Sequence, residues 1–386
     1  MIDFKKAVEE EKQATIDTRR DLHRIPETGF CEQKTSDFVS ERLRSLGLKV
    51  ETGIAKTGVV GWLELGKGGK TLMIRADMDA LPVEEKTGLS FASTHQGVMH
   101  ACGHDAHMAM ALGAASALSK LKGELKGSIK FVFQPAEEGP GGAKPMIEAG
   151  VLESPKVDFV TGCHLHDSAE GTIGVKAGCV LAANDRFDLK IIGKGGHGAM
   201  PHLCVDPIDV GVQVINALQR LISRKINPLS PVVLTIGRFH AGTAFNIIPG
   251  EAELSGTTRT FDRAIWDSWR ERMERIIKGV CEAMGAGYEL NFIRGYPPTV
   301  NHEALLEPVR RCAFQVVGER NVFEPVPIMA GDDMAYFLEK VPGFFFFLGV
   351  GHENSFPLHN SRFDFNEEVL SRGVEMYLRL AYELLK

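Results

Sequence analysis

The sequence predicts an α/β protein with a smaller α+β domain inserted into it, and three observations support this. Short apolar runs alternate with helical stretches up to about residue 183. From 184 to 295 the pattern changes to amphipathic strands around two long helices, and beyond that stretch the first pattern returns. A length of 386 residues suggests two domains. We therefore expect one discontinuous domain, 1–183 with 296–386, and an inserted domain, 184–295.

The discontinuous domain begins with two predicted helices, 3–24 and 33–47. Ile25-Pro26 and Gly29 separate them, because the residue before proline disfavours helix and glycine frees the backbone. Apolar runs then predict four strands and one helix: strands at 58–65, 71–76, 129–133 and 157–163, and a helix at about 105–121. The returning segment predicts a helix at 303–317, a buried strand at 343–349 and an amphipathic helix from 366.

The inserted domain starts with a predicted strand, RFDLKII, that follows residue 184. A helix comes next, with apolar residues at Ile208, Val212, Ile215, Leu218 and Ile222. The remaining elements are strands at 231–238 and 251–260, a helix at 262–284, and a strand near 288–293.

Composition narrows the function classes. The 44 basic residues against 50 acidic ones give a net charge of −6, which lacks the basic excess of a nucleic-acid binder. Seven widely spaced cysteines without a C-x-x-C pair argue against a disulfide framework and favour a reducing compartment. No apolar stretch approaches the roughly 20 residues of a membrane span. We expect a cytoplasmic protein with a small-molecule partner, binding neither nucleic acid nor membrane.

A dense cluster of potential metal ligands stands in HACGHDAH, just before the predicted helix at 105–121. It contains His100, Cys102, His104, Asp105 and His107. So many polar groups are costly to bury together without a shared cation, so the cluster predicts a metal site. His104 and His107 lie one helical turn apart, and the sequence does not decide whether both face the same ion.

Further polar residues follow four predicted strands of the sheet. They are Asp77 and Asp79, Glu137 and Glu138, His164 and His166, and His359. Ligand sites of open α/β sheets gather beyond the carboxyl ends of the strands, so these side chains are expected at one edge. Of two adjacent carboxylates, one can bind a metal while the other faces the attacking water. A solvated acidic turn would explain the Glu137–Glu138 pair alone equally well.

These motifs together resemble the M20 metallopeptidase clan, within the branch of N-acyl-amino-acid hydrolases, hippurate hydrolases, N-acetyldiaminopimelate deacetylases and auxin-conjugate hydrolases. The resemblance spans nearly the whole chain, through DLHRIPETGF, RADMDALP, HACGHDAHMAMALGAA, FQPAEEGPGGAKPMIEAG, GCHLH, GKGGHGAMPH, NIIPGEAELSGTTRTF and LHNSRFDFNEE. It implies a zinc-peptidase-like catalytic domain and an inserted lid through which two copies form a homodimer. Hinges are then expected near 183–186 and 294–298.

The resemblance also implies roles for single residues. Two divalent ions would be held by Cys102, His104, Glu138, His164 and His359. Glu137 would be the general base, and Asp79 would orient a ligand. Cysteine and histidine favour zinc, although the carboxylate leaves manganese, cobalt or nickel open. Asp77 replaces a ligand histidine of other branches, so its role stays open, as do those of His107, His166 and His202.

In the lid, the resemblance gives His197 the stabilisation of the oxyanion, in its own subunit or in the partner's. Asn246 and Arg259 would hold the substrate carboxylate, which a guanidinium can grip through two hydrogen bonds.

The predicted function is metal-dependent hydrolysis of the amide bond of N-acyl-L-amino acids, releasing a carboxylic acid and a free amino acid. One alternative is a dipeptidase or carboxypeptidase of the same family. Another is a non-catalytic protein that binds a metal or an amino acid. The intact Glu137–Glu138 pair argues against the last, because binding alone has no need of a base beside a ligand.

Overall fold

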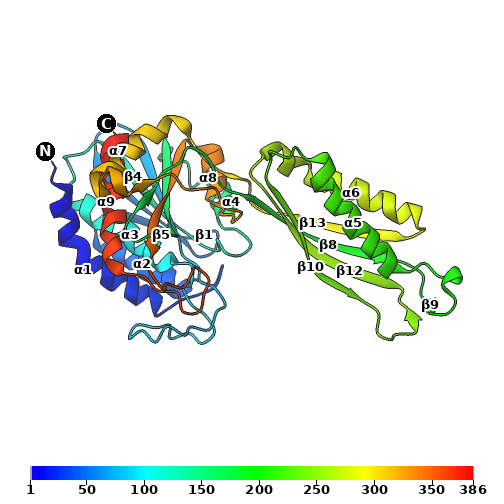
Figure 1. Ribbon diagram of the computed structural model, residues 1–386. Helices are drawn as coiled ribbons and strands as arrows, with labels where there is room; N and C mark the ends of the chain where they lie inside the picture. The colour runs from blue at the N-terminus through cyan, green and yellow to red at the C-terminus, as the bar shows by residue number, and fades with distance from the viewer. Residues whose placement is uncertain (1, 386) are drawn as a thin grey trace. The chain divides into compact units, whose positions relative to one another are not determined.

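The computed structural model, which describes residues 2–385, divides the chain into two compact units (Figure 1). The second unit consists of Leu181–Thr299 and the short segment Pro327–Gly331, and the rest of the described chain forms the first. The predicted inserted domain, 184–295, lies just inside the longer segment. Pro327–Gly331 had no signal in the sequence pattern. It joins the second unit because the Ala330 carbonyl accepts a hydrogen bond from the Ala182 amide, 2.8 Å away.

The first unit is built on a mixed eight-stranded sheet of order β1-β2-β4-β3-β5-β16-β6-β15. These strands are β1 (Lys49–Ile54), β2 (Gly58–Gly66), β3 (Thr71–Asp77), β4 (Gly127–Gln134), β5 (Phe159–Ala169), β6 (Ile173–Gly174), β15 (Val322–Phe323) and β16 (Gly343–Gly351). The central strands β4, β3, β5 and β16 run parallel. β3 and β4 are buried along their whole length, and β16 is buried up to its last residue, in line with their near-continuous apolar sequences.

Helices cover both faces of this sheet (Figure 1). On one side lie α1 (Phe4–His23), α2 (Gln33–Ser45), α3 (His104–Lys120) and α9 (Leu370–Leu384), and on the other α4 (Ala143–Glu148) and α8 (Met334–Lys340). The unit also contains α7 (Leu306–Val317) and the 3-10 turns η2 (Glu303–Leu305), η3 (Glu319–Asn321) and η4 (Glu367–Val369). The paired strands β7 (Gly178–Leu181) and β14 (Thr299–Asn301) lie where the chain passes from one unit to the other. No helix within residues 2–385 is long and apolar enough to cross a membrane.

Successive side chains of β3 point to opposite faces of the sheet, one of which belongs to the apolar core. Leu72 and Ile74 belong to the apolar core that α1, α3 and α9 share with the sheet. Arg75 projects from the opposite face, where it is fully buried and meets Asp332 and Asp333, just before α8. A charged residue thus occupies a position that the apolar run around it would assign to the core.

The second unit is a four-stranded antiparallel sheet of order β10-β12-β8-β13 packed against two helices. Its elements are β8 (Ala183–Ile192), β10 (Val232–Ala241), β12 (Glu251–Thr260), β13 (Gly287–Arg294), α5 (Pro207–Lys225) and α6 (Arg263–Ala283). The small strands β9 (Gly196–His197) and β11 (Ile247–Ile248) pair beside η1 (Pro201–Leu203). Phe187, Leu189 and Ile191 of β8 alternate into the core, as a half-covered sheet requires.

The apolar residues that predicted α5 divide between buried and exposed positions. The core receives Val210, Val214 and Leu218, whereas Ile208 and Val212 are 38% and 42% exposed. Helix α5 carries apolar residues around more than half of its circumference, so its sequence periodicity does not single out one buried face. The exposed positions leave an apolar stripe on the surface of the second unit.

Candidate metal centre

The predicted ligands all lie at the carboxyl edge of the parallel strands of the first unit. Glu138 follows β4, His164 lies within β5, and His359 follows β16. Cys102 and His104 enter from the turn that begins α3. Gly103 between them has φ +81°, and a Cβ atom there would lie 2.5 Å from Leu165 Cδ1, so this turn requires glycine.

The five predicted ligands converge. Cys102 Sγ lies 3.5 Å from His164 Nε2 and 3.3 Å from His359 Nε2. His359 Nε2 lies 3.0 Å from Glu138 Oε1. The ligand atoms of Cys102, His104 and His164 lie within 4.8 Å of one another, and so do those of Cys102, Glu138 and His359. Cys102 belongs to both groups, which suits two neighbouring ions.

Hydrogen bonds from the Nδ1 atoms of His104 and His164 fix the orientation of both rings. His104 Nδ1 donates to the Asp79 carbonyl at 2.8 Å, and His164 Nδ1 donates to the Leu165 carbonyl at 2.7 Å. Their Nε2 atoms therefore carry the free lone pairs. His104 Nε2 is buried, and it has no hydrogen-bond partner within residues 2–385. Buried polar atoms normally have a partner, and a metal ion would provide one for this nitrogen.

Neighbouring polar residues of the same motifs are engaged elsewhere. His107 donates from Nδ1 to Asp77 Oδ1 at 2.6 Å, and its Nε2 accepts from the Leu165 amide at 3.0 Å. Asp105 points away from the site and binds Arg19. His166 is half-buried, and its Nδ1 accepts from the Ser168 amide. Both ring nitrogens of His107 are thus hydrogen-bonded, whereas Nε2 of the neighbouring His104 is not, a difference that the sequence alone left undecided.

The carboxylate pair is fixed through its backbone. Asp79 Oδ1 accepts from the Glu137 amide at 2.9 Å, and Asp79 Oδ2 accepts from the Glu138 amide at 3.0 Å. Glu137 is 5% exposed. Burial, together with the nearby carboxylates of Asp332 and Glu138, raises the pKa of Glu137 well above its ordinary value. A carboxylate with a raised pKa accepts a proton readily, as a general base must.

The electrostatics of the donor set fit divalent cations. Burial and the carboxylate of Glu138 raise the pKa of the Cys102 thiol well above its ordinary value. Burial would lower the pKa of His104, but the carboxylates of Asp77 and Asp79 raise it to about 10. Burial lowers the pKa of His164 to about 3, which keeps that imidazole a neutral ligand. A cation would replace the protons that these acidic surroundings hold, so the residues present fit two bound metal ions.

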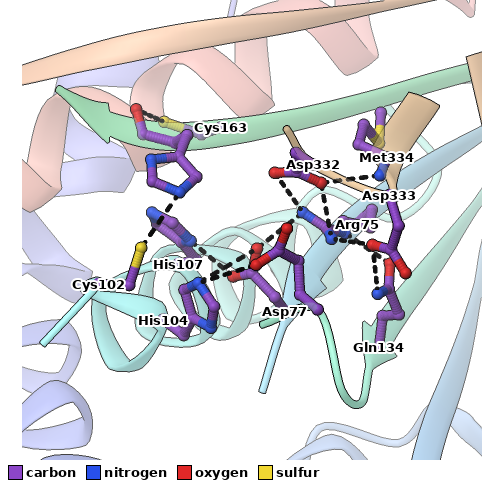
Figure 2. Close-up of polar contacts among 12 residues, drawn as sticks. Arg75, Asp77, Cys102, His104, His107, Gln134, Cys163, Asp332, Asp333 and Met334 are labelled. Atoms are coloured by element: carbon purple, nitrogen blue, oxygen red, sulfur yellow. Dashed lines mark hydrogen bonds and ion pairs between the residues drawn. The ribbon is translucent and has the colours of Figure 1, made fainter. Parts of the chain in front are cut away.

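Sequence reasoning missed a buried polar network beside Glu137. Figure 2 shows its members: Arg75, Gln134, Asp332 and Asp333. One carboxylate oxygen from each of Glu137, Asp332 and Asp333 lies within 4.8 Å of the other two. Two signals could have found the network: an arginine within the apolar strand TLMIRA, and the adjacent acids of AGDDM.

Comparisons with known proteins identify the family. The profile described as Peptidase family M20/M25/M40 matches residues 73–383. The N-acyl-L-amino acid amidohydrolase of Geobacillus stearothermophilus is 48% identical, over 78% of this chain and 81% of its own. The chain belongs to peptidase family M20. Another M20 relative, thermostable carboxypeptidase 1 of Saccharolobus solfataricus, is 42% identical to this chain, over 98% of this chain and 97% of its own.

A solved structure shares the whole M20 fold. The Bacillus subtilis YXEP protein, described as a dinuclear metal binding peptidase from the M20 family, matches with a TM-score of 0.85 and 35% identity. The match covers 98% of this chain and 99% of that one. Its description agrees with the two overlapping ligand groups around Cys102.

The remaining predicted residues of this M20 chain lie in the second unit, in two places. His197 and Asn246 are neighbours, since His197 pairs with Ile247 and the Gly198 amide donates to the Asn246 carbonyl at 2.9 Å. Arg259 lies near the other end of β12. Strands advance about 3.3 Å per residue, so Arg259 lies about 26 Å from Glu251, where β12 begins on the Asn246 side. The second unit brings two of its three predicted residues together, and the third is distant.

Proposed function

We propose that this M20 chain hydrolyses the amide bond of N-acyl-L-amino acids, with two divalent ions held by the five ligands around Cys102. The observation that carries the proposal is the Glu137–Glu138 pair, whose two amides are fixed by one carboxylate, that of Asp79. Glu138 lies with the ligands and Glu137 is buried beside them. A base held next to a metal ligand serves hydrolysis and has no use in a protein that only binds.

In the proposed mechanism, Glu137 transfers the proton and His197 stabilises the oxyanion. Two ions held at this site would supply Lewis-acid chemistry, which lowers the pKa of water and polarises the amide carbonyl of the substrate. Glu137 would take the proton from the attacking water and later deliver it to the leaving nitrogen, so one carboxylate would serve as base and then as acid. His197 donates a hydrogen bond to the developing oxyanion. The products are a carboxylic acid and a free amino acid.

Arg259 and Asn246 would recognise the carboxylate that every N-acyl amino acid carries. The Arg259 guanidinium can hold a carboxylate through two parallel charge-assisted hydrogen bonds. The amide of Asn246 can donate a further one.

The distance along β12 favours a homodimer in which each site uses both copies. An N-acyl amino acid is too short to span the roughly 26 Å between Arg259 and the start of β12. His197 and Asn246 would therefore serve the partner's site. The surface around them is apolar. Its exposed residues are Met200, Leu203, Ile208, Phe239, Phe245 and Ile247. Ile208, Phe245 and Ile247 line an open pocket of about 590 Å³, and a second copy would bury this apolar surface.

Zinc is the metal that the donor set favours, because a thiolate and three imidazoles are soft or borderline ligands. Manganese, cobalt and nickel are the other ions to test. None of the seven cysteines forms a disulfide within residues 2–385. Free thiols are typical of a reducing compartment, which supports the cytoplasm as the place of action.

A carboxypeptidase or dipeptidase is the second candidate, and the 42% identity to thermostable carboxypeptidase 1 favours it. The two activities differ in what lies beyond the scissile bond. An acetyl or benzoyl group carries no charge there, and a succinyl group carries a negative one, whereas a dipeptide carries a free, positively charged amine.

Release of amino acids from a substrate panel tests the proposal. The protein is stripped of metal, reloaded separately with zinc, manganese or cobalt, and given N-acetyl, N-benzoyl and N-succinyl amino acids and unblocked dipeptides. We expect metal-dependent release from the acylated substrates. Faster release from the dipeptides would favour the peptidase, and no release with two ions bound would favour a binding protein. Glu137→Gln is the control for a contaminating hydrolase.

A further inference from the structure

The residues that follow β4 form an irregular segment, 135–142, that we call the catalytic loop because it carries Glu137 and Glu138. Its sequence, PAEEGPGG, contains two prolines and three glycines and forms neither helix nor strand. Such a segment has many accessible conformations, so its geometry depends on what anchors it. Glu137 and Glu138 can act together only if those anchors hold the backbone.

Both ends of the catalytic loop are attached to Asp333. Gln134, the last residue of β4, donates from Nε2 to Asp333 Oδ1 at 2.7 Å. The backbone amide of Ala143, the first residue of α4, donates to Asp333 Oδ2 at 2.9 Å. Figure 2 shows the carboxylate of Asp333 between Arg75 and Gln134. One carboxylate thus connects the residue before the loop with the residue after it.

Arg75 completes the arrangement on the side of the sheet. Its Nη2 donates to Asp333 Oδ1 at 3.0 Å, and its Nε donates to Gln134 Oε1 at 2.9 Å. Arg75, Gln134 and Asp333 are each at most 1% exposed. Hydrogen bonds to ionised groups are stronger and better defined away from water, so the three side chains form a rigid base.

The middle of the catalytic loop has separate anchors. Asp79 accepts from the amides of Glu137 and Glu138. Glu32 accepts from the amide of Ala136 at 2.9 Å, where the backbone has φ +55°, a left-handed conformation that a non-glycine residue rarely adopts. Carboxylates therefore hold the loop at its centre, and Asp333 holds its two ends.

We propose that Asp333 is a positioning residue that, through Gln134 and Ala143, holds the catalytic loop so that Glu138 can bind metal and Glu137 can act beside it. The role of Glu137 rests on the proposed function. The holding of Glu138 is tested without any substrate, because displacement of one ligand weakens metal binding whatever the reaction is.

A purely structural role is the competing explanation, in which Asp333 only neutralises the buried Arg75. It predicts lower stability without a selective effect on the catalytic loop. Two substitutions separate the explanations. Asp333→Asn keeps the size of the side chain and removes its charge. Gln134→Leu removes the hydrogen bonds to Arg75 and Asp333 at similar volume and leaves every charge in place.

Thr161→Val is the matched control. Thr161 is 1% exposed on β5 of the same sheet, and its hydroxyl donates to the Phe344 carbonyl at 2.9 Å. The substitution removes one buried hydrogen bond away from the catalytic loop. It should lower thermal stability and leave the loop and the metal ligands as they are.

The first measurement is amide hydrogen exchange of peptides spanning 134–143, and the second is zinc affinity by competition with a chelating dye. For Asp333→Asn we expect exchange of the loop amides at least about 10-fold faster and zinc affinity lower by about 10- to 100-fold. Gln134→Leu should change both in the same direction, and Thr161→Val should change neither. On an active substrate, kcat should fall by about 10- to 100-fold in Asp333→Asn while KM stays within about threefold.

Unchanged exchange and zinc affinity in Asp333→Asn and Gln134→Leu, at a stability loss like that of Thr161→Val, would overturn the proposal. If Asp333→Asn does not fold, Gln134→Leu decides by the same two readouts. If the unsubstituted protein hydrolyses nothing in the panel, the proposed function fails, but exchange and zinc affinity still decide the role of Asp333.

Discussion

Single atoms decide the chemistry of the candidate centre. The sequence supplied the ligand types in HACGHDAH, but it could not show which ring nitrogen each histidine presents. The Asp79 and Leu165 carbonyls accept from the Nδ1 atoms of His104 and His164, which leaves Nε2 of both rings for a metal. His107 has both nitrogens occupied, one by Asp77 and one by a backbone amide. Hydrogen bonds between distant segments make this distinction, and such pairings leave no local sequence signal.

The substitution Glu137→Gln tests the base. Gln has the shape of Glu but cannot take a proton, so turnover should fall by roughly 100- to 10,000-fold or more. Zinc affinity should change little, because the ligand Glu138 and both amides on Asp79 are retained. Initial rates and a zinc titration of the same preparation measure the two effects. Near-normal turnover would show that another group takes the proton.

His23 gives a pH dependence to the stability of the first unit. Its Nδ1 lies 2.8 Å from Asp105 Oδ2, and its Nε2 lies 3.4 Å from Glu85 Oε1. Burial would lower its pKa, but these carboxylates outweigh burial and raise the pKa to about 9. Because the folded value exceeds the unfolded value of about 6.5, the stabilisation is complete below pH 6.5 and is lost as the pH rises toward 9.

Thermal unfolding of the protein and of His23→Gln at pH 6.5 and pH 9 measures this contribution. Gln can still donate to Asp105 but does not titrate. The protein with His23 should lose up to about 3 kcal/mol more stability between the two pH values than the variant does. Equal losses in both proteins would mean that His23 is not protonated in the folded state at pH 6.5.

At the scale of elements, periodicity predicted most helices and central strands to within a few residues. The predicted helix at 105–121 is α3, and the strand 343–349 begins where β16 does. Apolar periodicity was less informative for a helix with two apolar faces. Helix α5 has an apolar stripe for its own core and another that stays exposed, so the spacing of its apolar residues did not identify the buried face.

Elements that depend on distant partners also escaped prediction. The short edge strand β1 is mostly exposed, with a burial pattern that carries little apolar signal. Asp333 acquires its contacts from Gln134 and Arg75, about 200 positions or more away in the chain. Periodicity describes one element at a time, whereas the five proposed ligands lie in or near four elements, α3, β4, β5 and β16.

The length of β12 leads to a prediction about assembly. If His197 serves the partner's site, two inactive variants should restore each other: Glu137→Gln, whose own base is lost, and His197→Ala, whose histidine is lost. In mixed dimers the His197→Ala copy keeps Glu137 and receives His197 from its partner. Random exchange of subunits should recover roughly a quarter of the unsubstituted turnover. If no activity returns although mixed dimers form, His197 acts in its own copy.

At the scale of the whole molecule, the chain passes between its two units four times, after Val180, Thr299, Val326 and Gly331. The sequence led us to expect two crossings. The extra pair arises because Pro327–Gly331 joins the second unit before the chain returns at Asp332. Asp333, which we propose to hold the catalytic loop, therefore lies two residues beyond a crossing, and its hydrogen bonds connect this part of the chain with that loop.

We predict a ligand-dependent closure of the two units. The proposed metal ligands belong to the first unit and Arg259 belongs to the second, so a substrate held by both would link the units. Small-angle scattering of the zinc-loaded protein should show a smaller radius of gyration with a product amino acid than without it. Arg259→Ala should remove that difference, because it removes the proposed grip on the carboxylate across the units. An identical scattering curve with and without the amino acid, at concentrations where binding is demonstrated, would count against closure and would place carboxylate recognition within the first unit.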